Sequence, residues 1–109
     1  MFRNSRQKSD ALQTLLESVR LDHLWTSNGP TDAALRYRDA NGGPLSSGER
    51  VMLLAAFDLW NGTGGLKFAE MPGPLDPRRA QKLLSLLSAM TYGSDAVDRW
   101  LEREKSVHA

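Results

Sequence analysis

Hydrophobic positions near the start of the chain recur every three or four residues, which is the spacing of an amphipathic helix. Ser9 or Asp10 can cap this helix. We expect it to begin there and to bend or end within residues 20–25, before the helix-breaking letters SNGP at 27–30. Its apolar stripe consists of Leu12, Leu15, Leu16 and Val19.

The segment 46–60 is apolar over almost its whole circumference from Val51 to Trp60. Ser46 followed three residues later by Glu49 is the pattern of a capping box, in which each side chain satisfies a backbone donor at a helix start. A helix that is apolar all round is surrounded by other elements. The pattern therefore predicts a central helix over 46–60, stopped by the glycines of NGTGG at 61–65.

Three further helices are predicted around this one. Residues 30–40 form a short helix with Pro30 in its first turn. Asp76 caps, and Pro77 begins, a helix that ends at Gly93. Ser94 then caps a last helix that continues to residue 105. Between the central helix and Asp76, the glycines and prolines of 61–76 predict a long loop, with a short extended piece around 66–68.

We therefore expect an all-α fold: a compact, irregular and partly orthogonal bundle of about five helices around the central helix 46–60, with the long Gly/Pro loop 61–76. Unequal helices and a long loop favour irregular packing over an up-and-down bundle. A chain of 109 residues is long enough for one core. We divide it into a basic flexible arm at 1–8, a single helical domain at 9–105 and a flexible tail at 106–109.

The amino-acid composition excludes several kinds of site and partner. Cysteine is absent, which excludes disulfides, thiolate zinc sites and a cysteine nucleophile, and makes the reducing cytoplasm the expected location. No apolar stretch is long enough to cross a bilayer, and the first ten residues lack the apolar segment of a secretory signal. We expect no membrane partner.

Motifs for phosphate or cation binding are incomplete. GTGGLK at 62–67 follows a predicted helix, whereas a phosphate loop precedes one. DANGGPLSSGER at 39–50 begins like a calcium loop, but Pro44 stands where glycine is needed and Arg50 where a bidentate glutamate is needed. With only two histidines and no nucleophile elbow, the sequence predicts no enzyme, no catalytic residue, no cofactor and no metal site.

Asp58 is the one charge inside the apolar run of the central helix. A buried carboxylate without a partner costs several kcal/mol. An arginine, an amide of the loop 61–65 or a helix N-terminus would each pair with this carboxylate and offset that cost equally well. We interpret Asp58 as a buried structural acid that ties the returning loop to the helix. The weaker alternatives are a functional base, a charge that faces a partner, and a small-molecule sensor pocket near Asp58 and the glycine loop.

Tryptophan, tyrosine and arginine are typical of protein interfaces. We expect the chain to be a small non-catalytic protein–protein interaction module, such as an adaptor, inhibitor or regulatory subunit, although at least two of the tryptophans should be mostly buried. The candidate interaction residues are Trp25, Arg36, Tyr37, Arg38, Trp60 and Trp100.

The alternative function is that of a DNA-binding transcriptional regulator with a degenerate helix-turn-helix at 77–105. The net charge is only +1, but residues 1–8 carry three bases and no acid, and such an arm can contact nucleic acid. The simpler interpretation of the arm is a frayed chain end. The candidate nucleic-acid contacts are Arg3, Arg6, Lys8, Arg99 and Arg103.

Overall fold

The computed structural model describes residues 1–108, with the side chains of residues 1–105. The α-helices are α1 Ser5–Glu17, α2 Asp32–Asp39, α3 Ser47–Asn61, α4 Pro77–Tyr92 and α5 Ser94–His108. The shorter elements are the 3-10 helices η1 Asp22–Leu24 and η2 Phe68–Glu70 and the strands β1 Trp25–Thr26 and β2 Gly29–Pro30. The predicted all-α bundle is confirmed.

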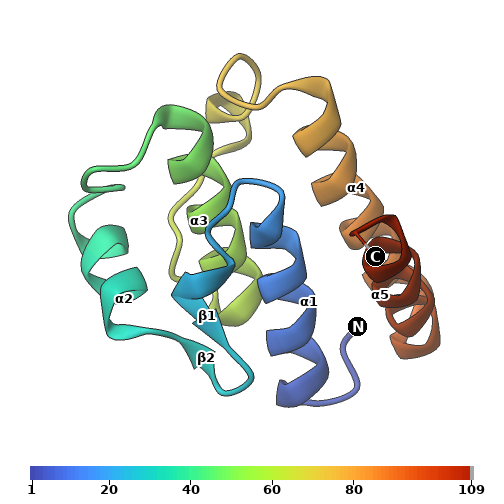
Figure 1. Ribbon diagram of the computed structural model, residues 1–109. Coiled ribbons are helices and arrows are strands. Elements are labelled where there is room, and N and C mark those ends of the chain that lie inside the picture. Colours follow the sequence, from blue (N-terminus) through green and yellow to red (C-terminus); the bar gives the residue numbers. More distant parts are fainter. Residues whose placement is uncertain (109) are drawn as a thin grey trace.

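The helices α1 and α3 pack against each other in the middle of the molecule (Figure 1). The hairpin and α2 cover one side of this pair, and α4 and α5 cover the other, where both contact α1. On α3, every side chain from Val51 to Phe57 is buried, whereas Asp58, Leu59 and Trp60 are half-buried. The enclosed part of α3 therefore ends one turn before the helix does.

Local signals set the ends of α3 and α4 as predicted. The Ser46 side chain accepts from the amide of Glu49, whose carboxylate accepts from the amide of Ser46, so the capping box is present. Gly62 ends α3 in the left-handed conformation, with φ 77°, which glycine adopts without steric cost. Asp76 caps α4 and Pro77 is its first residue.

The chain ends differ from the prediction. α1 begins at Ser5, not at Ser9, because the Asn4 side chain accepts from the amide of Gln7 and caps the helix. Residues 5–8 of the predicted arm therefore belong to α1. At the other end, α5 continues to His108, so residues 106–108 belong to a helix; Ala109, the last residue of the predicted tail, lies outside the described residues.

Residues 27–30, which the sequence predicted only to interrupt the helix, belong to a β-hairpin that was not predicted. Trp25 pairs with Pro30 and Thr26 with Gly29 in antiparallel register. The Thr26 hydroxyl closes the turn, since it donates to the carbonyl of Gly29. α2 accordingly starts at Asp32 rather than at Pro30, with Thr31 as its cap.

The loop 61–76 contains η2 in place of the expected extended piece. The Glu70 carboxylate accepts from the amide of Lys67 at 2.9 Å and closes this single turn. As a result Leu66 is half-buried, while Phe68 is turned outward and is 87% exposed. The loop returns to the core at Leu75, which is buried.

Candidate functional site

Two of the three tryptophans are core residues, as expected for at least two of them. Trp25 is 1% and Trp100 is 0% exposed. The Trp25 ring packs edge-on against Phe57 and Trp60, with centroids 5.2 and 5.8 Å away. Trp100 donates from Nε1 to the hydroxyl of Ser85. The core thus encloses two of the candidate interaction residues, Trp25 and Trp100, and leaves neither side chain exposed to a partner.

Trp60 is half-buried and is covered from two sides. The Lys8 ammonium lies 5.3 Å from its ring centroid and donates to its carbonyl oxygen at 2.8 Å. On the hairpin, Gly29 lies so near that a Cβ there would come within 2.9 Å of the ring. Little of this indole remains for a partner.

The three candidate interaction residues on α2 do not form one surface patch. Arg36 is exposed. Tyr37 is half-buried and packs against the core. The Arg38 guanidinium lies 4.8 Å from the ring centroid of Phe57 and bonds to Thr63 and Asp39. Arg38 therefore fastens α2 to α3, and only Arg36 is free to contact another molecule.

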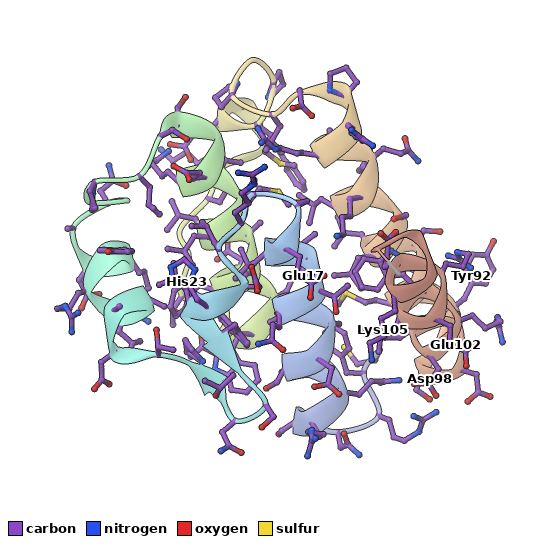
Figure 2. All side chains as sticks on the ribbon, viewed as in Figure 1. Glu17, His23, Tyr92, Asp98, Glu102 and Lys105 are labelled. Atoms are coloured by element: carbon purple, nitrogen blue, oxygen red, sulfur yellow. The ribbon has the colours of Figure 1, made fainter. Side chains whose placement is uncertain are left out.

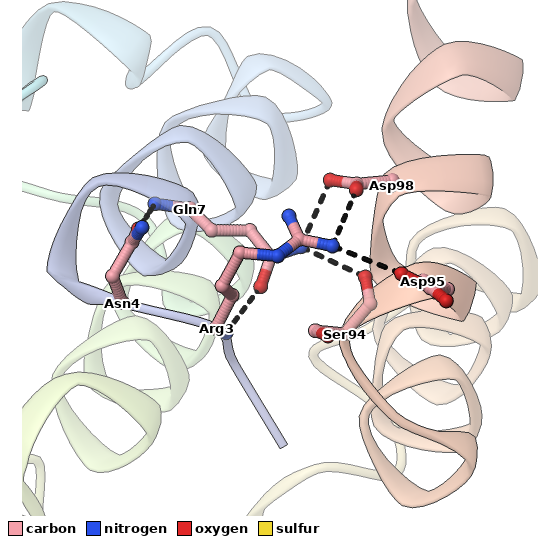
Figure 3. A network of polar contacts seen from close by, with 6 residues as sticks. All are labelled: Arg3, Asn4, Gln7, Ser94, Asp95 and Asp98. Carbon is pink, nitrogen blue, oxygen red and sulfur yellow. Dashed lines mark hydrogen bonds and ion pairs between the residues drawn. The ribbon is translucent and has the colours of Figure 1, made fainter.

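The basic residues before α1 are fastened to the body of the protein. The Arg3 guanidinium contacts the carboxylates of Asp95 and Asp98 on α5 at 3.0 and 2.9 Å, as Figure 3 shows. Arg6 pairs with Asp10 at 3.7 Å. With Lys8 held by Trp60, each of the three predicted nucleic-acid contacts in this segment has an acceptor within the chain.

Gln7 is buried where the start of α1 meets the start of α5, and we call this contact the junction. Its amide nitrogen donates to the Ser94 carbonyl and to Asp98 at 2.8 and 2.9 Å, and its oxygen accepts from the amide of Arg3 (Figure 3). The hydrogen bonds from Arg3 and Gln7 lower the pKa of Asp98, and the bond to Asp98 raises that of Arg3. The network joins the start of α1 to the start of α5.

Asp58 is half-buried rather than fully buried. One of its oxygens accepts from the amides of Gly64 and Gly65 at 2.8 and 3.0 Å, and the other accepts from the amide of Leu66 at 3.1 Å. Gly64 has no room for a side chain, since a Cβ would come within 1.9 Å of the Leu54 carbonyl oxygen. The loop amides thus donate hydrogen bonds to the carboxylate, and these bonds hold the returning loop against α3.

An apolar pocket of about 190 Å³ lies beside Asp58, between α3, α4 and the loop. We call it the Asp58 pocket. Within the described residues, Asp58 is the one polar side chain of its lining. The exposed ring of Phe68 stands at its rim. The lining residues are Ala55, Asp58, Leu59, Leu66, Phe68, Met71, Leu83 and Leu87.

A larger groove of about 520 Å³ runs between α4 and α5, and we call it the α4–α5 groove. Leu84 is 53% and Tyr92 is 84% exposed there; Figure 2 shows Tyr92 pointing away from the core. Neither residue was singled out from the sequence. The groove is lined by Gln81, Leu84, Ser85, Ser88, Ala89, Tyr92, Ala96, Arg99 and Arg103.

Arg99 and Arg103 are exposed at this groove. Within residues 1–105, neither guanidinium forms a hydrogen bond or an ion pair, and no carboxylate belongs to the lining. The structure thus brings two of the predicted nucleic-acid contacts together with Leu84 and Tyr92. It does not join them to Arg3, which is held on the acidic side of α5 by Asp95 and Asp98.

Lys82 on α4 is a largely buried cation. Its side chain is 9% exposed and its ammonium lies 3.7 Å from Glu104 of α5. Burial lowers its pKa, and the nearby charges of Glu104 and Glu17 oppose this effect. The ammonium has no hydrogen-bond acceptor among the described residues, so it holds α4 to α5 by charge alone.

In the part of the chain that the structure describes, no three His, Asp or Glu side chains gather as metal ligands. His23 is exposed on η1, and the side chain of His108 lies outside the described residues. None of the described helices has the length and apolar character needed to traverse a lipid bilayer.

Comparison with known proteins identified no similar family, curated protein or solved structure.

Proposed function

We propose that the chain is a non-catalytic protein-binding module whose α4–α5 groove receives an acidic, amphipathic helix of another protein. The observation that carries the proposal is the composition of this groove. Exposed Leu84 and Tyr92 lie beside Arg99 and Arg103, and no carboxylate of the described residues lines the groove. An adaptor, an inhibitor or a regulatory subunit would act in this way.

Shape and chemistry both support a helix as the occupant. A groove between two packed helices accepts the apolar face of a third, with anchors one turn apart. Leu84, Ser88 and Tyr92 are spaced by one turn along α4, and tyrosine and arginine are the residue types that contribute most at interfaces. Among residues 1–105 the guanidiniums of Arg99 and Arg103 have no partner, which favours carboxylates on the incoming helix.

DNA binding, the alternative function, has less support. Arg3, Arg6 and Lys8 all have acceptors within the chain. α5 also presents Asp95 and Asp98 close to its start, where a recognition helix approaches phosphates. Of the five residues predicted to contact nucleic acid, Arg99 and Arg103 are the two without a partner among residues 1–105. We propose the cytoplasm as the location, because a chain without cysteine suits a reducing compartment.

Affinity capture from extract of the native cells tests the proposal. We expect the unchanged chain to capture a protein that the double variant Leu84→Ser, Tyr92→Ser no longer captures. Phe68→Ser is the matched control, because it also removes an exposed apolar side chain but lies outside the groove. Capture of the same proteins by all three chains, or capture that nuclease abolishes, would contradict the proposal.

A further inference from the structure

The Asp58 pocket combines an apolar wall with a carboxylate that pairs with no cation among residues 1–105. Asp58 is bonded to three backbone amides. Amide dipoles stabilise a negative charge but do not cancel it. No lysine or arginine of the described residues belongs to the lining, and none of the ion pairs found there involves Asp58. The pocket therefore carries a net negative charge.

The carboxylate also keeps acceptor capacity. Its two oxygens offer about four positions for hydrogen bonds, and the amides of Gly64, Gly65 and Leu66 use three. About one acceptor position is therefore left for a further donor. A cationic donor forms a stronger bond to a carboxylate than a neutral donor does.

The volume and the lining of the Asp58 pocket define the part of the ligand that does not contact the carboxylate. A volume of about 190 Å³ is smaller than the pockets that hold drug-sized molecules, which are roughly 300–1,000 Å³. Leu59, Leu83 and Leu87 offer only hydrocarbon. A metal ion does not fit, because Ca²⁺ and Mg²⁺ need several oxygen ligands and the lining supplies one carboxylate.

We propose that the Asp58 pocket binds a small organic ammonium ion, that is, a primary amine on a short aromatic or branched aliphatic body. The ammonium group donates to Asp58, and the body packs between α3 and α4. Phe68 stands at the rim with its ring 87% exposed, so the bound molecule also covers this ring. A cation near an aromatic face gains additional attraction.

This site is separate from the groove of the proposed function. Leu83 and Leu87 line the Asp58 pocket, whereas Leu84 and Ser88 line the groove on another face of α4. The two proposals therefore fail or succeed independently, and a variant in one site serves as the control for the other.

The test is a titration of the ¹⁵N-labelled chain with three probes of similar size, followed by the amide resonances of Gly64, Gly65 and Leu66. Phenethylamine carries the cation, phenethyl alcohol is neutral, and phenylpropionate is an anion. We expect phenethylamine to shift these resonances and to bind at least about tenfold more tightly than the alcohol, since charge-assisted hydrogen bonds are roughly twice as strong. Phenylpropionate should not bind.

Substitution of a lining residue other than Asp58 provides the second arm of the test, because Asp58→Asn removes an acceptor of the loop amides and disturbs the fold itself. Met71→Trp fills the pocket and leaves Asp58 and its three amide donors in place. We expect it to abolish phenethylamine binding, while Tyr92→Ser in the groove leaves the Kd unchanged. Equal affinity for amine and alcohol, no binding of the amine, or an unchanged Kd in Met71→Trp would each overturn the proposal.

Discussion

The indole nitrogen of Trp100 lies 2.8 Å from the hydroxyl oxygen of Ser85 and donates a hydrogen bond to it. Ser85 in turn donates to the carbonyl of Lys82 one turn earlier in α4. Because Trp100 is fully buried on α5, this bond fixes the separation of the two helices that form the α4–α5 groove. The groove is therefore a consequence of core packing.

Ser85→Ala should destabilise the protein by about 1–3 kcal/mol, because the buried indole N–H loses its acceptor. Ser88→Ala is the matched control on the same helix, since Ser88 is exposed and the change to alanine improves helix propensity equally. Urea denaturation measures both free energies of unfolding. Equal values for the two variants would mean that the indole finds another acceptor.

Gly64→Ala should be much more damaging than Gly62→Ala. A Cβ at position 64 would come within 1.9 Å of the Leu54 carbonyl oxygen, whereas one at position 62 meets nothing within 4 Å. Gly62 has φ 77°, so alanine there costs about 1 kcal/mol of backbone strain. The clash at Gly64 must displace the loop from Asp58, and we expect a loss of about 3 kcal/mol. Thermal unfolding followed by circular dichroism compares the two variants, and similar melting temperatures would contradict this packing.

The junction of Arg3, Gln7 and Asp98 should weaken in acid. The pKa of Asp98 is lowered from its ordinary 3.8 by hydrogen bonds from Arg3 and Gln7. Its contribution to stability is therefore complete above 3.8 and is lost as the pH falls through the lowered value. Asp98→Asn should be less stable than the unchanged chain at neutral pH, and the difference should disappear in acid.

Asp95→Asn is the control for this junction, since the Asp95 side chain also pairs with Arg3 but is 86% exposed. We expect a smaller loss at neutral pH and little change with acid. Denaturant unfolding over a series of pH values measures both variants. A constant difference between Asp98→Asn and the unchanged chain at every pH would show that the carboxylate charge is not what the network uses.

Lys82 should also make stability rise with pH, but in an alkaline window. Burial lowers its pKa from the ordinary 10.5, so the folded state resists the charged form. This penalty is complete below the lowered value and is relieved as the pH rises towards 10.5. The unchanged chain should therefore gain stability relative to Lys82→Met over that window. Lys67→Met, which removes a lysine at an exposed position, is the control in the same unfolding measurements.

The elements with local signals were predictable from the sequence. Ser46 with Glu49, and Asp76 with Pro77, mark helix starts through bonds that close within one turn. The start of α1 was not predictable in this way. Gln7 is polar yet buried, because its partner Asp98 lies 91 positions away, and no local pattern indicates that α5 will cover it.

The groove was unpredictable for a related reason. Leu83, Leu84, Leu86 and Leu87 are all apolar, so periodicity alone cannot show which of them α5 and α1 leave uncovered. The structure buries Leu83 and Leu86 and exposes Leu84. Tyr92 stands at the last position of α4, where the helical pattern ends. Its exposure depends on the sharp connection through Gly93 rather than on the residues beside it.

Photo-cross-linking from inside the groove tests protein binding most directly. Benzoylphenylalanine is incorporated at position 88, in the groove, and at the exposed position 22 on η1 as the control. In native extract, position 88 should cross-link to a helical segment of one protein with carboxylates on its polar face, and Arg99→Glu with Arg103→Glu should abolish the product. Cross-links to nucleic acid, or equal yields from positions 88 and 22, would contradict the proposed function.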